Sequence, residues 1–134
     1  MFSNRKELKT TNGKTTTVVA PGFSSITGLK QIDSSHVAVV DGGNYCIYLV
    51  NREADSIIEL AGTCGYRGFV DGTSAKFDHP WNIELDKRNP GHLLVTDLFN
   101  QALRSVDVTS GTVSTVIRTG FNNPAGLLGT RDVC

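Results

Sequence analysis

The chain has 134 residues, a length typical of one domain, and its thirteen basic residues are balanced by thirteen acidic ones. This neutrality argues against a nucleic-acid partner, and no apolar run approaches the roughly 20 residues that cross a bilayer. Fourteen glycines and many Thr, Ser, Val and Ile residues favour short strands and tight turns. We therefore expect an all-β protein with almost no helix.

The first predicted elements are two strands within residues 1–23. The second of them lies in Gly13–Phe23, which aligns with Gly111–Phe121 near the other end of the chain. At the same offset Gly28 aligns with Gly126. Both ends of the chain therefore carry partial copies of one repeated unit.

Residues 24–62 contain four strand candidates. After the second candidate comes the pattern Asp41-Gly-Gly-Asn44, with an apolar Ile47 and a Val50 in the strand that follows. An Asp at the end of a strand most often caps the turn that follows it, and we assign that role to Asp41. The four candidates begin near Ile26, Val37, Tyr45 and Ser56.

Residues 63–79 form a long connection, and residues 80–120 repeat the four-strand pattern. Asp97-Leu-Phe-Asn100, with Leu103 and Val106, follows the first copy at a distance of fifty-six residues. The strand candidates of this second copy begin near Pro80, Leu93, Leu103 and Thr112. Four short strands per repeat is typical of a β-propeller blade.

Residues 121–134 match the first two strands of a further copy. The whole chain then amounts to about three blades, whereas closed propellers have about four to eight. We expect an incomplete propeller that another chain or a further segment completes through residues 1–20 and 124–134. A head-to-tail homodimer is one way to complete it.

The motif Pro80-x-x-Ile, Leu93-Leu-Val-Thr-Asp97, Asn100 and Gly111-x-Val-Ser-Thr-Val116 resembles the NHL repeat, the unit of NHL-type β-propellers. The resemblance is closest over residues 80–120 and looser over residues 26–62, where Ile26 replaces the proline. It implies a propeller fold but no particular reaction, because members of this family include RNA-binding, protein-binding, extracellular and lyase-like proteins.

The three cysteines bear on whether the protein resides in an oxidising or a reducing cellular compartment. Cys46 and Cys64 are expected on neighbouring parts of one blade, either bonded to each other or buried as two thiols. The resemblance to extracellular NHL proteins with a Cys pair in a blade implies the disulfide and hence an oxidising compartment. Cys134 is then unpaired or bonded to another chain.

The sequence contains no motif for catalysis or metal binding. A Gly-x-Ser-x-Gly elbow, a phosphate loop and an Asp-x-Asp cluster are all missing, and His36, His79 and His92 do not have the spacing of zinc ligands. We therefore predict a protein that is not an enzyme and that has no cofactor and no metal. Its basic residues are dispersed apart from a small cluster in residues 5–14.

Trp81, with Tyr66 and Arg67 in the long connection, is the predicted binding face, because an aromatic ring at the start of a strand can stack on a ligand. The function expected is that of a non-catalytic extracellular scaffold that binds a protein through its loops and open blade edges. An intracellular, cytoplasmic propeller that binds RNA or protein is the alternative, and carbohydrate binding or a lyase-like enzyme is a lesser one.

Overall fold

The computed structural model describes residues 6–11, 15–20 and 22–119. It consists of ten antiparallel strands in three sheets, joined by turns and one three-residue 3-10 helix. The all-β prediction and the prediction of four antiparallel strands per repeat are confirmed. The elements are β1 (Lys6–Thr11), β2 (Thr15–Ala20), β3 (Ile26–Gln31), β4 (His36–Asp41), β5 (Cys46–Asn51), β6 (Ser56–Gly62), β7 (Pro80–Leu85), β8 (His92–Asp97), η1 (Leu98–Asn100), β9 (Ala102–Asp107) and β10 (Val113–Arg118).

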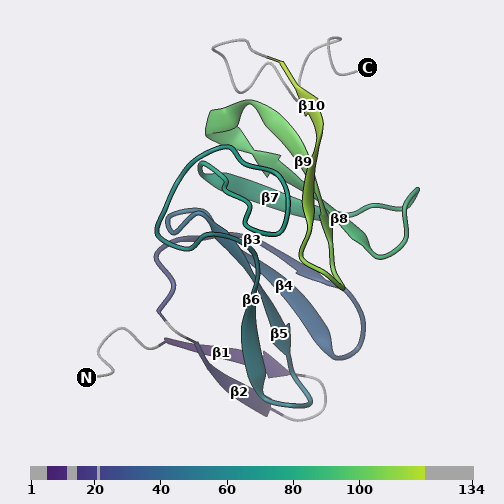
Figure 1. Ribbon diagram of the computed structural model, residues 1–134. Helices are drawn as coiled ribbons and strands as arrows, with labels where there is room; N and C mark the ends of the chain where they lie inside the picture. The colour runs from purple at the N-terminus through teal and green to yellow at the C-terminus, as the bar shows by residue number, and fades with distance from the viewer. Residues whose placement is uncertain (1–5, 12–14, 21, 120–134) are drawn as a thin grey trace.

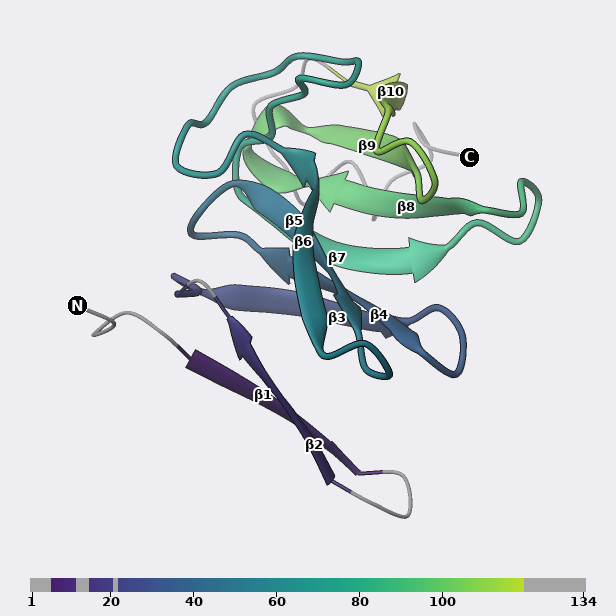
Figure 2. The same ribbon diagram turned by 60° about the horizontal axis from the view of Figure 1, so that its bottom comes forward.

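Each four-stranded sheet follows chain order, β3-β4-β5-β6 in one and β7-β8-β9-β10 in the other, while β1 and β2 form a separate hairpin (Figure 1). The first strands of the two larger sheets, β3 and β7, lie side by side (Figure 2). The hydroxyl of Thr27 on β3 donates a hydrogen bond of 2.9 Å to the carbonyl of Pro80 on β7. We call β3, β4, β7 and β8 the inner strands, since this junction joins the two sheets.

The β3–β6 sheet has apolar residues on both of its faces because both are covered. Ala38 and Val40 point into the core between the two four-stranded sheets, whereas Val39 points to the other side, where it packs with Phe23 and Tyr48. Alternation along a strand sends neighbouring residues to opposite faces. The unbroken apolar run in β4 therefore reflects burial on both sides.

The two sheets repeat each other in turn conformation as well as in sequence. Tyr45 and Gln101 have positive φ angles of 63° and 55° at the same place in the β4–β5 and β8–β9 connections. Asp55 and Gly111 do the same before β6 and β10, with φ of 52° and 76°. Residues after the β3–β4 turn correspond at a spacing of fifty-six, as His36 and His92 do at the starts of β4 and β8.

Before that turn the spacing is two residues shorter. Ile26 starts β3 and Pro80 starts β7, which puts corresponding residues fifty-four apart. The connection from Leu85 to His92 is longer than the one from Gln31 to His36, and this accounts for the change. The correspondence allows each position of one sheet to be compared with its counterpart in the other.

The predicted division into residues 1–23, 24–62, 63–79, 80–120 and 121–134 stays a prediction. Residues 121–134, with the two strands expected there, lie outside the described residues, as do residues 1–5.

Candidate binding surfaces

Corresponding residues on the first inner strands differ sharply in exposure. Ile83 on β7 is only 4% exposed, because it packs in the core between the two four-stranded sheets. Its counterpart on β3 is Leu29, which is 60% exposed. Leu29 pairs with Val39 in the same register in which Ile83 pairs with Val95. We call this side of the β3–β6 sheet the leading face.

Each four-stranded sheet also has a side opposite to its leading side, and we call this side of the β7–β10 sheet the trailing face. Here the difference in exposure is reversed, since the residues of the first sheet are the buried ones. In the first sheet Ala38, Val40 and Ile47 on this side are fully buried under the second sheet. The counterparts in the second sheet are Leu94, Thr96 and Leu103, all only partly buried. The register is again the same, since Val40 pairs with Ile47 and Thr96 with Leu103.

Val116, on the outer strand β10, is half-exposed. Within the described residues, Leu29 is therefore an exposed apolar residue at the β3 edge of a leading face on which Val39 and Tyr48 are buried beside Phe23, and the trailing face is partly exposed. These are the two kinds of surface that meet at its internal interface.

A second surface is aromatic and lies where the β4–β5 and β8–β9 connections meet the segment entering β7. His79 stacks on Phe99 with ring centroids 4.1 Å apart, and Tyr45 meets His79 edge to face at 5.3 Å. The imidazole Nδ1 of His79 lies 2.9 Å from a carboxylate oxygen of Asp78. Phe99 is 53% exposed, so much of its ring faces solvent.

The predicted binding residues are exposed but make no contact with one another that the structure records. Trp81 on β7 is half-exposed, while Tyr66 and Arg67 are exposed in the connection from β6 to β7. Sequence reasoning missed Phe99, although its neighbours Asp97 and Asn100 were singled out. A large apolar residue inside a predicted turn was the signal that could have found it.

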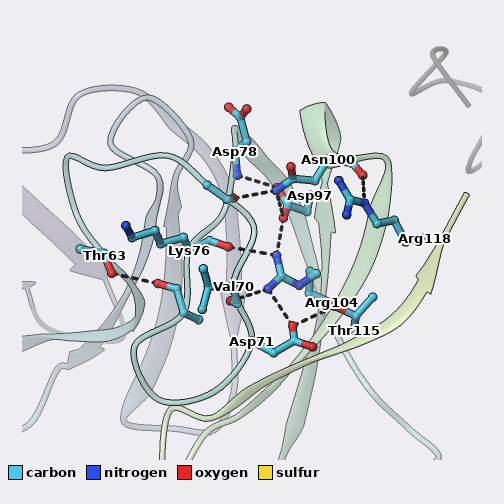
Figure 3. A network of polar contacts seen from close by, with 12 residues as sticks. Thr63, Val70, Asp71, Lys76, Asp78, Asp97, Asn100, Arg104, Thr115 and Arg118 are labelled. Carbon is cyan, nitrogen blue, oxygen red and sulfur yellow. Dashed lines mark hydrogen bonds and ion pairs between the residues drawn. The ribbon is translucent and has the colours of Figure 1, made fainter. Parts of the chain in front are cut away.

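A buried arginine fastens that long connection to the second sheet (Figure 3). Arg104 on β9 donates to the Asp97 carboxylate at 2.5 Å, to the Asp71 carboxylate at 2.9 Å, and to the carbonyls of Val70 and Lys76. Its guanidinium also lies 4.6 Å from the centre of the Phe69 ring. Both Arg104 and Asp97 are fully buried.

Asp97 has several hydrogen-bond donors around it. The side-chain amide of Asn100 and the backbone N–H of Asp78 each donate at 2.8 Å. Burial raises the pKa of the Asp97 carboxyl, and those hydrogen bonds together with the charge of Arg104 oppose the shift. Asn100 also donates to the carbonyl of Gly68, so it ties the same connection to the turn.

Asp41 makes the corresponding contacts in the first sheet. It accepts hydrogen bonds from the backbone N–H groups of Ser24 and Ser25, which enter β3. The sequence prediction placed this cap on the turn after the strand, and there the structure differs: each signature aspartate holds the segment that leads into its own sheet. The side-chain amide nitrogen of Asn44 lies 4.0 Å from the Cys46 sulfur, and the backbone carbonyl of Asn44 accepts a hydrogen bond from the N–H of Gly65.

Cys46 and Cys64 form a disulfide, which joins the start of β5 to the beginning of the long connection. The pairing implied by the family resemblance is therefore present. Cys46 is fully buried, and its sulfur bridges a loop whose ends are eighteen residues apart in sequence. Cys134 lies outside the described residues.

Over residues 6–11, 15–20 and 22–119, no three His, Cys, Asp or Glu side chains gather as they would around a metal ion. In this described part there is also no helix long and apolar enough to span a membrane. The three histidines considered as zinc ligands lie apart from one another. Each lies next to an aspartate: Asp33 for His36, Asp78 for His79 and Asp107 for His92.

Among the described residues, the exposed edge of the leading face at Leu29, the partly exposed trailing face and the aromatic cluster of Tyr45, His79 and Phe99 are therefore candidate surfaces for binding. Compared with known proteins, the chain matches no protein-family model and no curated protein.

Proposed function

We propose that the chain is part of an NHL-type β-propeller that binds another protein and carries out no catalysis. Two four-stranded antiparallel sheets with adjacent inner strands support the propeller arrangement. The repeated turns and the sequence resemblance support the NHL type. Binding would occur at the exposed edge of the leading face, at the trailing face and at neighbouring loops.

One observation carries the binding proposal, the contrast between Leu29 and Ile83. The two residues occupy the same position in the repeat and have similar side chains, yet only Ile83 is covered. The trailing face repeats the contrast at Leu94, Thr96 and Leu103. Apolar surface of this kind is stabilised when another protein surface removes it from water.

The test uses the whole chain as bait in affinity capture from the fluid or extract of its source. Wild-type chain is compared with Leu29→Asp, Leu94→Asp and the control Ile58→Asp, which changes an exposed apolar residue elsewhere, on the outer strand β6. We expect a partner that wild type and Ile58→Asp retain and that both face variants lose. The same set of retained proteins on all four baits would contradict the proposal.

An extracellular or secretory-lumen location is part of the proposal, and the Cys46–Cys64 bond supports it, because disulfides persist mainly in oxidising compartments. Chain taken directly from its source into an alkylating reagent should have both cysteines unmodified in the intact protein. Modification of both would instead favour the intracellular alternative, in which the propeller binds RNA or protein with reduced cysteines.

A second candidate function is carbohydrate binding at the aromatic surface, favoured by the exposed ring of Phe99 on its support of His79 and Tyr45. Flat aromatic faces in such positions can stack on sugar rings. Glycan-array binding that Phe99→Ala abolishes and Tyr66→Ala leaves intact would support it. An array that shows no binding by wild type would dismiss it.

A further inference from the structure

The aromatic cluster has a carboxylate beside it that carries no basic counter-charge. The backbone N–H of Asp78 donates to the buried Asp97, while the side-chain carboxylate of Asp78 points away from the Arg104 network (Figure 3). One oxygen of this carboxylate lies 2.9 Å from Nδ1 of His79. Among the described residues, no lysine or arginine lies within ion-pair distance of Asp78. A negative charge and the half-exposed ring of Phe99 therefore belong to one surface.

The backbone holds both groups in place. The N–H of Phe99 donates to the carbonyl of Asp78 at 3.1 Å, and the N–H of Leu98 donates to the carbonyl of His79 at 3.3 Å. His79 has a φ of 57°, in the left-handed region that a residue with a side chain seldom adopts. Such conformations are concentrated at sites that bind ligands. A ligand would meet groups that are already positioned, so little ordering would oppose its binding.

The same molecule shows which group a carboxylate and an aromatic ring bind together. In the connection from β6 to β7, the guanidinium of Arg104 donates to the Asp71 carboxylate at 2.9 Å and lies 4.6 Å from the centre of the Phe69 ring. The guanidinium of Arg118 also lies over this ring, at 3.8 Å. A planar guanidinium suits both contacts, because it can stack on a ring and donate N–H groups to a carboxylate.

We infer that the aromatic cluster, with Asp78, is a site for an arginine side chain of the partner protein. The inference rests on the proposed binding function and names the group by which the partner is held. The guanidinium packs on the exposed part of the Phe99 ring and neutralises the Asp78 carboxylate. A lysine ammonium lacks the flat face that stacks on a ring, and a neutral sugar leaves the carboxylate without a counter-charge. Arginine is also among the residues that contribute most to protein interfaces.

The test titrates N-acetyl-arginine amide into the full chain and follows the backbone N–H signals by NMR. N-acetyl-citrulline amide has nearly the same shape without the charge and is the matched probe. We expect saturable shifts at Asp78 and Phe99 with a dissociation constant on the order of 10 mM for the arginine probe. Citrulline should bind about 5-fold more weakly or worse, since it lacks the ion pair and the cation–π contact.

Two pairs of variants locate the site. Asp78→Asn and Phe99→Leu remove the charge and the ring, and each should weaken binding of the arginine probe about 3-fold or more. Asp33→Asn is the control for the charge, because Asp33 also lies beside a histidine, His36, at 3.0 Å. Tyr66→Leu is the control for the ring, and both controls should bind as wild type does. The N–H spectrum of each variant reports its folding.

Three results would overturn the inference. They are no saturable shift with about 100 mM of the arginine probe, equal binding of the arginine and citrulline probes, and binding that Asp78→Asn and Phe99→Leu leave unchanged. Methyl glucoside is titrated in parallel. Shifts of the same signals with this sugar and none with the arginine probe would favour carbohydrate binding and overturn the arginine site.

The capture experiment separates this inference from the proposed function. Asp78→Asn used as bait should retain less of the partner than Asp33→Asn does. A partner that Asp78→Asn retains as well as wild type would overturn the arginine site and leave binding at the sheet faces standing. No partner on any bait would remove the proposed function, whereas saturable binding of the arginine probe would still support a site for a guanidinium group.

Discussion

Arg104 shows how a single residue can hold a long connection in place. In the segment from Phe69 to Phe77, Val70 and Lys76 exchange backbone hydrogen bonds, and the carbonyls of both also accept from the Arg104 guanidinium. Arginine suits this role because its planar group presents several donors in a fixed geometry. Removing it would leave the buried carboxylate of Asp97 without its counter-charge.

Arg104→Met is expected to lower the free energy of unfolding by about 3–5 kcal/mol, the usual cost of breaking a buried ion pair from one side. The control is Arg118→Met. Arg118 also lies over Phe69, at 3.8 Å from the ring centre, but it is exposed, and its loss should cost about 1 kcal/mol or less. Urea unfolding measures both. Equal costs for the two variants would refute the anchoring role of Arg104.

At the scale of elements, the turns that lead into β6 and β10 are each held by hydrogen bonds to the side chain of the first residue of the turn. Asp107 accepts hydrogen bonds from the N–H groups of Thr109 and Ser110, and Asn51 accepts from Glu53 and Ala54 in the corresponding turn. The Thr109 and Ser110 N–H groups lower the pKa of Asp107 below its usual 3.8. In the β3–β4 turn, the N–H of Ser35 and the His36 side chain similarly lower the pKa of Asp33.

A carboxyl whose pKa is lower in the folded state contributes stability above its unfolded pKa and loses it as the pH falls through the folded value. The free energy of unfolding of Asp107→Asn should therefore fall less than that of wild type as the pH drops below about 4. The substitution should keep the turn, because Asn51 supports the same geometry in the corresponding turn of the first sheet. Unfolding free energies measured between pH 2 and 7 for both proteins test this. Parallel curves for the two would show that Asp107 makes no such contribution.

Gly62 ends β6 at a point where the start of β5, which carries the disulfide-bonded Cys46, and Phe77 of the long connection both come close to its backbone. Its φ is 89°, and a Cβ there would lie 2.7 Å from the Tyr45 carbonyl and 2.9 Å from a Phe77 ring carbon. Gly72 has a similar φ of 105° but nothing within 4 Å of such a Cβ.

Gly62→Ala and Gly72→Ala both force alanine into the left-handed region, which costs about 1–2 kcal/mol. Only Gly62→Ala adds steric overlap with backbone, so its loss in unfolding free energy should exceed that of Gly72→Ala by at least about 1 kcal/mol. The difference between the unfolding free energies of the two variants, measured by thermal or urea unfolding, gives the cost of the steric overlap at Gly62. A larger loss in Gly72→Ala would be the contrary result.

At the scale of the whole molecule, coverage by a neighbouring sheet decides what an apolar residue contributes. Ile83→Ala should destabilise the chain by about 2–5 kcal/mol, since it opens a cavity in the core between the sheets. Leu29→Ala should cost less than about 1 kcal/mol when measured on monomeric chain, since its side chain is largely in water. Comparable losses would mean that Leu29 is covered within the chain itself.

The repeat made much of this arrangement predictable from sequence. The fifty-six-residue spacing of the Asp-x-x-Asn pattern, the alternation of apolar residues and the turn residues are local, and they determined the all-β class, the antiparallel strands and the number of strands in each of the two repeats. Each strand forms from its own residues and those next to it in the hairpin, so its pattern is contained in a short stretch of chain.

Other features depend on contacts between distant segments, and only the tertiary structure decided them. Arg104 looked like a dispersed basic residue until Val70, Asp71 and Asp97 surrounded it. Leu29 and Ile83 are equivalent in sequence and differ only in whether another sheet lies over them. Side chains of the same kind, at the same place in a repeat, acquire different roles because burial is a property of the neighbours, which no local pattern encodes.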